Sequence, residues 1–167
     1  MQIRCAEAAD EAALADIRRS AILGLAVAAM SMEQAETWAA RAAPDRIARA
    51  IREHDVWVAA LDAAAIGWVE VDRDHLAALY VSPSCARRGV GSALLARAET
   101  SMRNSGYATA RLESSQNALE FYFRRGYRRW RPRCHWRMSV AQRSGRRCGR
   151  VNERRALLTA RGMILAP

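Results

Sequence analysis

The stretch LYVSPSCARRGVGSALL, residues 79–95, carries the strongest structural signal in the chain. It starts as an apolar strand, turns at a proline, passes Arg87 and Arg88, and enters a helix beyond Gly89 and Gly91. The free amides and the dipole at the first turn of a helix favour an anion. Glycine also lets a ligand lie directly against the backbone. The stretch therefore predicts a pyrophosphate cradle, although a tight turn that merely leads into a helix has the same pattern.

Composition argues against several other sites. All 27 basic residues are arginine, so the lysine of a GxxxxGK[ST] phosphate loop or of a Schiff base is missing. The third glycine of the dinucleotide motif GxGxxG would fall at position 94, which is Leu94. The cysteines are not paired at the short spacing that zinc sites use, so we expect free thiols and no metal.

Charge divides the chain into two parts. Residues 1–120 carry 13 arginines against 16 acidic residues, whereas residues 121–167 carry 14 arginines against Glu153 alone. The positive charge thus lies in the last part of the chain. From the order of the expected helices and strands we expect one domain over residues 1–138, followed by a basic C-terminal extension over residues 139–167. In the extension we expect a final strand and a short helix over 152–160, which would be unstable alone. We expect this helix to dock and to contribute to a homodimer; a disordered extension is the alternative.

Periodicity and turn residues predict a mixed order of helices and strands. Helices are expected over residues 9–25, 32–42, 45–54, 92–104 and 118–125, the second opened by a capping box at Ser31 and Gln34. Strands are expected over residues 2–5, 56–61, 66–71, 75–81, 109–113, 127–131 and 135–140. The start of the chain shows no secretory signal, and the longest apolar stretch is too short to cross a bilayer, so we expect a soluble, cytoplasmic protein without a membrane partner.

Two motifs resemble those of a known superfamily. LYVSPSCARRGVGSALLARAE closely resembles the coenzyme A motif of the GNAT superfamily of N-acetyltransferases, and NALEFYFRRGY, residues 117–127, resembles its second signature. The resemblance covers residues 1–138 and implies an α/β (α+β) fold. This GNAT fold has a mixed, mostly antiparallel central sheet with helices on both faces. Two parallel strands, here 75–81 and 109–113, would splay apart to admit acetyl-CoA.

The resemblance also implies which residues hold the coenzyme. The strand edge would pair with the pantetheine arm, and the amides of residues 87–92 would hold the pyrophosphate. The residues implied are Leu79, Tyr80, Val81, Arg87, Arg88, Gly89, Val90, Gly91, Ser92 and Asn117. The chain departs from the superfamily at Ala86, where Gln or Arg is usual, and at Ser115, where many members have Asn. Asn117 also fits a helix N-cap completed by Glu120.

The resemblance assigns the proton donor more firmly than the base. Tyr122 matches the tyrosine that protonates the departing thiolate, although it would also pack on its short helix. His75 begins the strand 75–81 and has a suitable ordinary pKa for a base at neutral pH. A surface position is the alternative for His75. Glu70 and Glu113 are rival bases, and ordered water could relay the proton instead.

The acceptor pocket of this superfamily is built from the first two helices and their link, which here includes Met30 and Trp38. The link is apolar, which indicates a modest, partly apolar amine. Glu70, Asp72 and Asp74 alternate and would form one acidic strand face, which would attract a cationic acceptor or simply be solvated. Glu70, Glu113, Met30 and Trp38 are therefore our candidate acceptor-binding residues.

These observations predict an acetyl-CoA-dependent N-acetyltransferase that acts on a primary amine of a small molecule or peptide by direct attack. One alternative is a nucleic-acid-binding protein, because RRGYRRWRPRCHWR interleaves arginine with Tyr127, Trp130 and Trp136. Another is a GNAT member that binds acyl-CoA without turnover; the intact Tyr122 argues against it.

Overall fold

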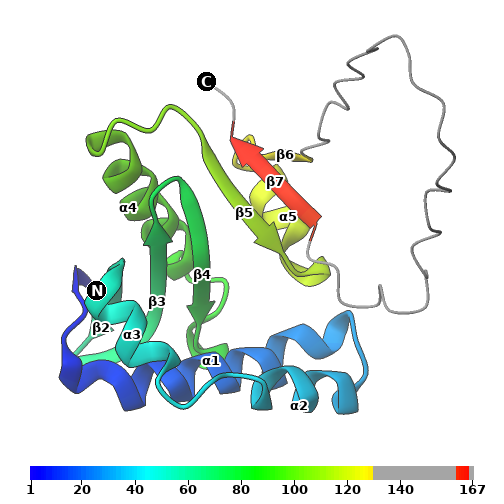
Figure 1. Cartoon of the computed structure of the whole chain (residues 1–167). Helices are drawn as coiled ribbons and strands as arrows, with labels where there is room; N and C mark the ends of the chain where they lie inside the picture. The colour runs from blue at the N-terminus through cyan, green and yellow to red at the C-terminus, as the bar shows by residue number, and fades with distance from the viewer. Residues whose placement is uncertain (130–160, 166–167) are drawn as a thin grey trace, which may run out of the picture.

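The computed structural model describes residues 1–129 and 161–165. Their strands form one seven-stranded sheet in the order β1-β2-β3-β4-β5-β7-β6 (Figure 1). The strands are β1 (Gln2–Cys5), β2 (Asp55–Leu61), β3 (Ala64–Asp72), β4 (His75–Val81), β5 (Ala110–Ser114), β6 (Arg128–Arg129) and β7 (Arg161–Leu165). Only β4 and β5 run parallel among these neighbours. The expected mixed, mostly antiparallel sheet is thus confirmed.

Helices and 3₁₀ turns connect and cover the strands. The α-helices are α1 (Glu11–Leu25), α2 (Met32–Ala40), α3 (Arg46–Glu53), α4 (Val90–Asn104) and α5 (Leu119–Phe123). The 3₁₀ turns are η1 (Ala8–Asp10), η2 (Ala26–Ala28), η3 (Pro83–Cys85) and η4 (Gln116–Ala118). The predicted capping box is present, because Gln34 N donates to Ser31 Oγ at 3.2 Å and Ser31 N donates to Gln34 Oε1 at 3.0 Å. None of these helices is long and apolar enough to span a membrane.

The two faces of the sheet bury two separate cores. Alternate residues of a strand point to opposite faces, so Trp57 and Val69 join the core that includes α4 and α5. Val58 and Trp68 join the core that includes α1 and α3. Both faces are therefore covered by helices, as the fold prediction required.

The two parallel strands separate soon after they meet. In the described part of the chain, β4 and β5 pair only at His75↔Arg111 and Leu76↔Leu112. Beyond Leu76 the strands diverge (Figure 1). The far end of β4, residues 77–81, thus presents a backbone edge without a β5 partner. The splay that the resemblance implied is present.

The chain after α4 differs from the prediction in two places. Asn117 is not a helix N-cap: it lies inside η4, and Ala118 precedes α5 without a side-chain cap. The predicted strand 135–140 and helix 152–160 lie outside the described residues. The last described strand is β7, which lies between β5 and β6. Residues 161–165 of the C-terminal extension therefore belong to the sheet of the domain that precedes them.

Candidate active site

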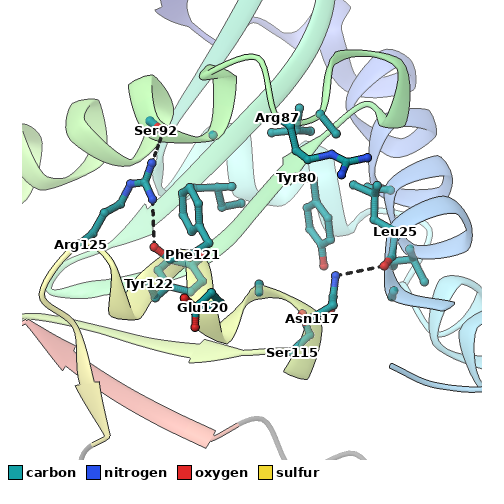
Figure 2. A pocket seen from close by; sticks show the side chains of 18 of the residues that line it. Leu25, Tyr80, Arg87, Ser92, Ser115, Asn117, Glu120, Phe121, Tyr122 and Arg125 are labelled. Carbon is teal, nitrogen blue, oxygen red and sulfur yellow. Dashed lines mark hydrogen bonds between the residues drawn. The ribbon is translucent and has the colours of Figure 1, made fainter. Parts of the chain in front are cut away.

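A cavity of about 500 Å³ opens where β4 and β5 diverge. Its walls come from α1 with η2, from α2, from β4 and the following loop, and from η4 with α5 (Figure 2). The lining residues predicted from sequence are Trp38, Leu79, Tyr80, Val81, Arg87, Gly89, Gly91, Ser92, Asn117 and Tyr122. Segments that are distant in the sequence thus meet at one opening through the sheet.

The turn before α4 is shaped for close approach of a ligand. Gly89 is the N-cap residue with φ 85°, and no side chain caps the helix. A Cβ at Gly89 would have nothing within 4 Å, and a Cβ at Gly91 would lie 3.6 Å from Phe121 and 3.7 Å from Leu79. Among the described residues the space beside Gly89 is therefore open, whereas Gly91 lies in ordinary contact distance of Phe121 and Leu79, and the absence of a side chain at both positions lets an anionic group approach the first turn of α4. Arg87, with φ 62°, lies on the same wall.

Tyr122 lies on α5 in the wall of the cavity and is buried, with 5% of the residue exposed. Its ring packs edge-on against Phe121 at 4.9 Å and against Tyr127 at 5.5 Å between centroids. Burial raises the pKa of Tyr122, and the nearby Tyr80 raises it further, while Arg125 opposes the shift. The hydroxyl therefore keeps its proton at neutral pH and is present as a donor.

Arg125 is a site residue that the sequence interpretation missed. It lines the cavity, and its guanidinium carbon lies 3.8 Å from the centroid of the Phe121 ring. Its Nη1 donates to the Phe121 carbonyl at 2.9 Å, and its Nη2 donates to the Ser92 hydroxyl. The side chain thus joins the α5 wall to the first turn of α4 (Figure 2). The available signal was the arginine that follows Phe121 by four residues, at helical spacing.

The opposite end of the cavity is apolar and aromatic. It is formed by Ile22, Leu25, Ala26 and Trp38. Asn117 donates from Nδ2 to the Leu25 carbonyl at 3.3 Å, so it joins η4 to the end of α1. Ser115 lines the same region, whereas Met30 does not line the cavity. Of the two acceptor-pocket residues predicted in the helix link, the structure thus places Trp38 in the wall.

Several other predicted residues lie away from the cavity. His75 is at the start of β4, opposite Asp72 and beside Arg111, at the far end of the strand from Val81. Glu113 is exposed on β5, and neither it nor His75 lines the cavity. Arg88 and Val90 also lie outside the lining, and Val90 is buried in the α4 core. The tertiary arrangement therefore does not bring His75 and Tyr122 together.

The three carboxylates of the predicted acidic face have different surroundings in the structure. Glu70 is 1% exposed and accepts hydrogen bonds from Arg46 at 2.5 Å and from His54 Nδ1 at 2.6 Å. Asp74 pairs with Arg111 at 2.6 Å. Strand β3 ends at Asp72, so Asp74 lies in the turn beyond it, and the pairing register shifts between Glu70 and Val71. Helix α3 supplies the Arg46 that pairs with Glu70. Glu70 is thus a paired buried group, not a free site for a cationic acceptor.

One of the three aromatic residues in the basic stretch proposed for nucleic-acid binding is not available at the surface. Tyr127 is 2% exposed, and its hydroxyl donates to Glu99 at 3.0 Å, so its ring cannot stack on a base. Trp130 and Trp136 lie outside the described residues. Among those described, no group of His, Cys, Asp or Glu side chains is arranged to hold a metal ion.

Comparisons with known proteins place this geometry in a family. The acetyltransferase (GNAT) domain matches residues 26–138. A GCN5-related N-acetyltransferase from Rhodopseudomonas palustris is 29% identical, with a TM-score of 0.75 over 78% of this chain and 82% of that one. The PaiA N-acetyltransferase from Thermoplasma acidophilum, solved in complex with coenzyme A, shares the fold at 22% identity, with a TM-score of 0.70 over 77% of this chain and 90% of that one. No protein of curated function matches the sequence. The chain belongs to the GNAT acetyltransferase family.

Proposed function

We propose that the chain is an acetyl-CoA-dependent N-acetyltransferase that acts on a primary amine of a small molecule or peptide. The observation that supports this best is a single cavity lined by the uncapped start of α4, the free edge of β4 and the buried phenol of Tyr122. Each feature matches one part of the donor: diphosphate, extended amide arm and thioester sulfur. The coenzyme A in the related PaiA structure supports the same donor.

The residues present fit such a donor. The open space beside Gly89 and the absence of a side chain at Gly91 let a diphosphate approach the amides of the first turn, and the helix dipole favours its charge. Arg87 adds a positive charge on the same wall. The edge of β4 near Leu79 and Val81, which pairs with no strand on this side among the described residues, supplies backbone groups for an amide arm, as one strand does for another. This cradle replaces the missing lysine and needs no metal.

In the proposed reaction the amine nitrogen attacks the thioester carbonyl directly. The new C–N bond forms, the C–S bond breaks, and the sulfur takes the proton of the Tyr122 hydroxyl. Tyr122 keeps that proton at neutral pH because burial raises its pKa. Its position beside the cavity makes it the donor for the leaving group. The proton that the attacking nitrogen loses as it becomes the amide returns to the phenolate through water, so the tyrosine is restored.

The attacking ammonium must also lose a proton. The described lining residues contain no histidine, and their one carboxylate, Glu120, pairs with Arg124 at 2.9 Å. His75, Glu70 and Glu113 lie outside the lining. We therefore assign the proton to water in the open cavity, which was one of the options left by the sequence.

The function is tested by following thiol release from acetyl-CoA with a panel of amines and peptides. Release that depends on the amine, with a product heavier by one acetyl group, supports the proposal. Tight coenzyme binding without transfer to any acceptor would instead favour the non-catalytic alternative.

A further inference from the structure

One end of the cavity is left unassigned by the proposed function. On the side of α1 and α2 its wall is apolar, with Ile22, Leu25 and Ala26 beside the half-buried indole of Trp38. The polar side chains there are Tyr80, Ser115 and Asn117. This end has the shape and polarity of a small-molecule pocket, which is mostly apolar with a few placed polar groups.

Tyr80 projects from β4 into this end. Leu79 approaches Gly91 on the α4 side, and strand alternation turns Tyr80 to the opposite side, toward α1. Figure 2 shows its phenol pointing along the cavity toward Asn117. The coenzyme side and the Tyr80 side of the cavity are thus contributed by successive residues of one strand.

The Tyr80 ring packs against the ring of Trp68 on the neighbouring strand β3. Its centroid lies 5.4 Å from the ring of Trp68, which is 1% exposed and donates from Nε1 to the Leu14 carbonyl at 3.0 Å. Trp68 therefore fixes the phenol relative to helix α1. A hydroxyl on such a supported ring is a precise reference point for a ligand.

The cationic groups near Tyr80 hold hydrogen bonds of their own. Burial raises the pKa of Tyr80. The charge and hydrogen bonding of Arg18 and the charge of Arg46 lower this pKa, whereas the charge of Glu70 raises it. Arg18 donates to the carbonyls of Ala39 at 2.9 Å and Trp38 at 3.2 Å, and Arg46 pairs with Glu70. Because Glu120 is on the α5 side, no carboxylate lines this end among the described residues. A polycation would find no counter-charge here.

From this arrangement, and resting on the proposed function, we infer that Tyr80 binds the acceptor and selects a primary monoamine with a flat apolar body. The amine donates one N–H to the Tyr80 hydroxyl oxygen, which has two lone pairs. The nitrogen lone pair then stays free to face the thioester on the Tyr122 side. The apolar body lies between Trp38 and the wall of Ile22 and Leu25, where it leaves water.

Steady-state kinetics with 2-phenylethylamine, spermidine and a lysine-containing peptide tests this inference. We expect kcat/KM to be at least about tenfold higher for 2-phenylethylamine than for spermidine, since the latter must leave a second charge unpaired. Tyr80→Phe removes only the hydroxyl and should lower kcat/KM for 2-phenylethylamine about 10- to 100-fold. The KM for acetyl-CoA should be unchanged. Trp38→Leu should raise the KM for the amine more than it lowers kcat.

Tyr107→Phe is the matched control, because Tyr107 lies outside this cavity and its loss of a hydroxyl should leave the kinetics unchanged. Calorimetry of 2-phenylethylamine binding to the coenzyme A complex gives a readout independent of turnover, and Tyr80→Phe should weaken this binding. A preference for spermidine or the peptide, or a Tyr80→Phe enzyme equal to wild type, would overturn the inference and leave the acetyltransferase standing. Absence of transfer to every amine would overturn both.

Discussion

Arg125 donates a hydrogen bond to the hydroxyl of Ser92 and so joins the residues after α5 to the first turn of α4. The two residues are 33 positions apart in the sequence. Their contact fixes the distance between the glycine turn and the helix that carries Tyr122. The glycine turn and the helix that carries Tyr122 are thus linked directly by one side-chain hydrogen bond.

A double-mutant cycle measures this bridge. We expect Arg125→Ala and Ser92→Ala each to lower the free energy of unfolding in urea, with a coupling energy of about 1 kcal/mol between them. Arg124→Ala is the control, because its pair with Glu120 is exposed on both sides and contributes little. A coupling energy indistinguishable from zero would contradict the bridge.

The glycine turn is tested with Gly91→Val. The Cβ of the valine would already lie 3.6 Å from Phe121 and 3.7 Å from Leu79, so its methyl groups would crowd the first turn of α4 and keep a diphosphate from the amides. We expect acetyl-CoA affinity to fall about 10- to 100-fold in calorimetry while the circular dichroism spectrum stays that of wild type. Ala96→Val places the same side chain at an exposed position of α4 and should bind the coenzyme normally. Equal affinities for both variants would rule out this turn as the diphosphate site.

Tyr122→Phe removes the proposed proton donor and keeps the packing of the ring. Turnover should fall about 100- to 10,000-fold, with acetyl-CoA affinity nearly unchanged. Tyr127→Phe, which loses the hydrogen bond to Glu99, should lower stability by about 1 kcal/mol without a comparable loss of turnover. If Tyr122→Phe turns over as fast as wild type, Tyr122 serves only to pack the helix.

His75→Gln distinguishes the sequence prediction that His75 is the base from the proposal that water takes the proton of the amine. Because His75 lies outside the cavity lining, we expect kcat/KM within about twofold of wild type and the same pH–rate profile. The loss of an ionisation near neutral pH in this variant would restore His75 as the base and contradict our assignment of the proton to water.

The Arg4–Asp10 pair should make stability depend on pH in acid. Arg4 donates two hydrogen bonds of 2.7 Å to Asp10, and these hold the pKa of Asp10 below its ordinary value of 3.8. Because the pKa of Asp10 is lower in the folded protein than in the unfolded chain, the ionised carboxylate stabilises the fold at pH values above 3.8. This stabilisation is lost as the pH falls below 3.8 and through the pKa of the folded state. Asp10→Asn should therefore cost about 1–2 kcal/mol at pH 7 and progressively less as the pH falls below 3.8. Asp16→Asn, at an exposed position, is the control; a penalty for Asp10→Asn that persists at the lowest pH would contradict the ionic origin.

The local features of the fold could be predicted from the sequence. The range of β4, the glycine turn and the capping box at Ser31 depend on residues within a few positions of one another. Proline, glycine and capping side chains restrict the backbone there without help from the rest of the chain. The same dependence on neighbours explains why the cap prediction for Asn117 is wrong: its sequence context fits a cap, but a carbonyl 92 residues away accepts its hydrogen bond.

The sequence by itself thus determined the family, the turn before α4 and the tyrosine on α5, because each of them depends on a short motif of neighbouring residues. Only the tertiary structure decided that Glu70 is buried against Arg46 and His54, and that His75 is at the wrong end of its strand for the cavity. It also decided that residues 161–165 enter the sheet between β5 and β6. These outcomes follow from packing between distant segments: alternation assigns a side chain to a face of the sheet, but which helix covers that face, and with which charge, is set by the whole fold.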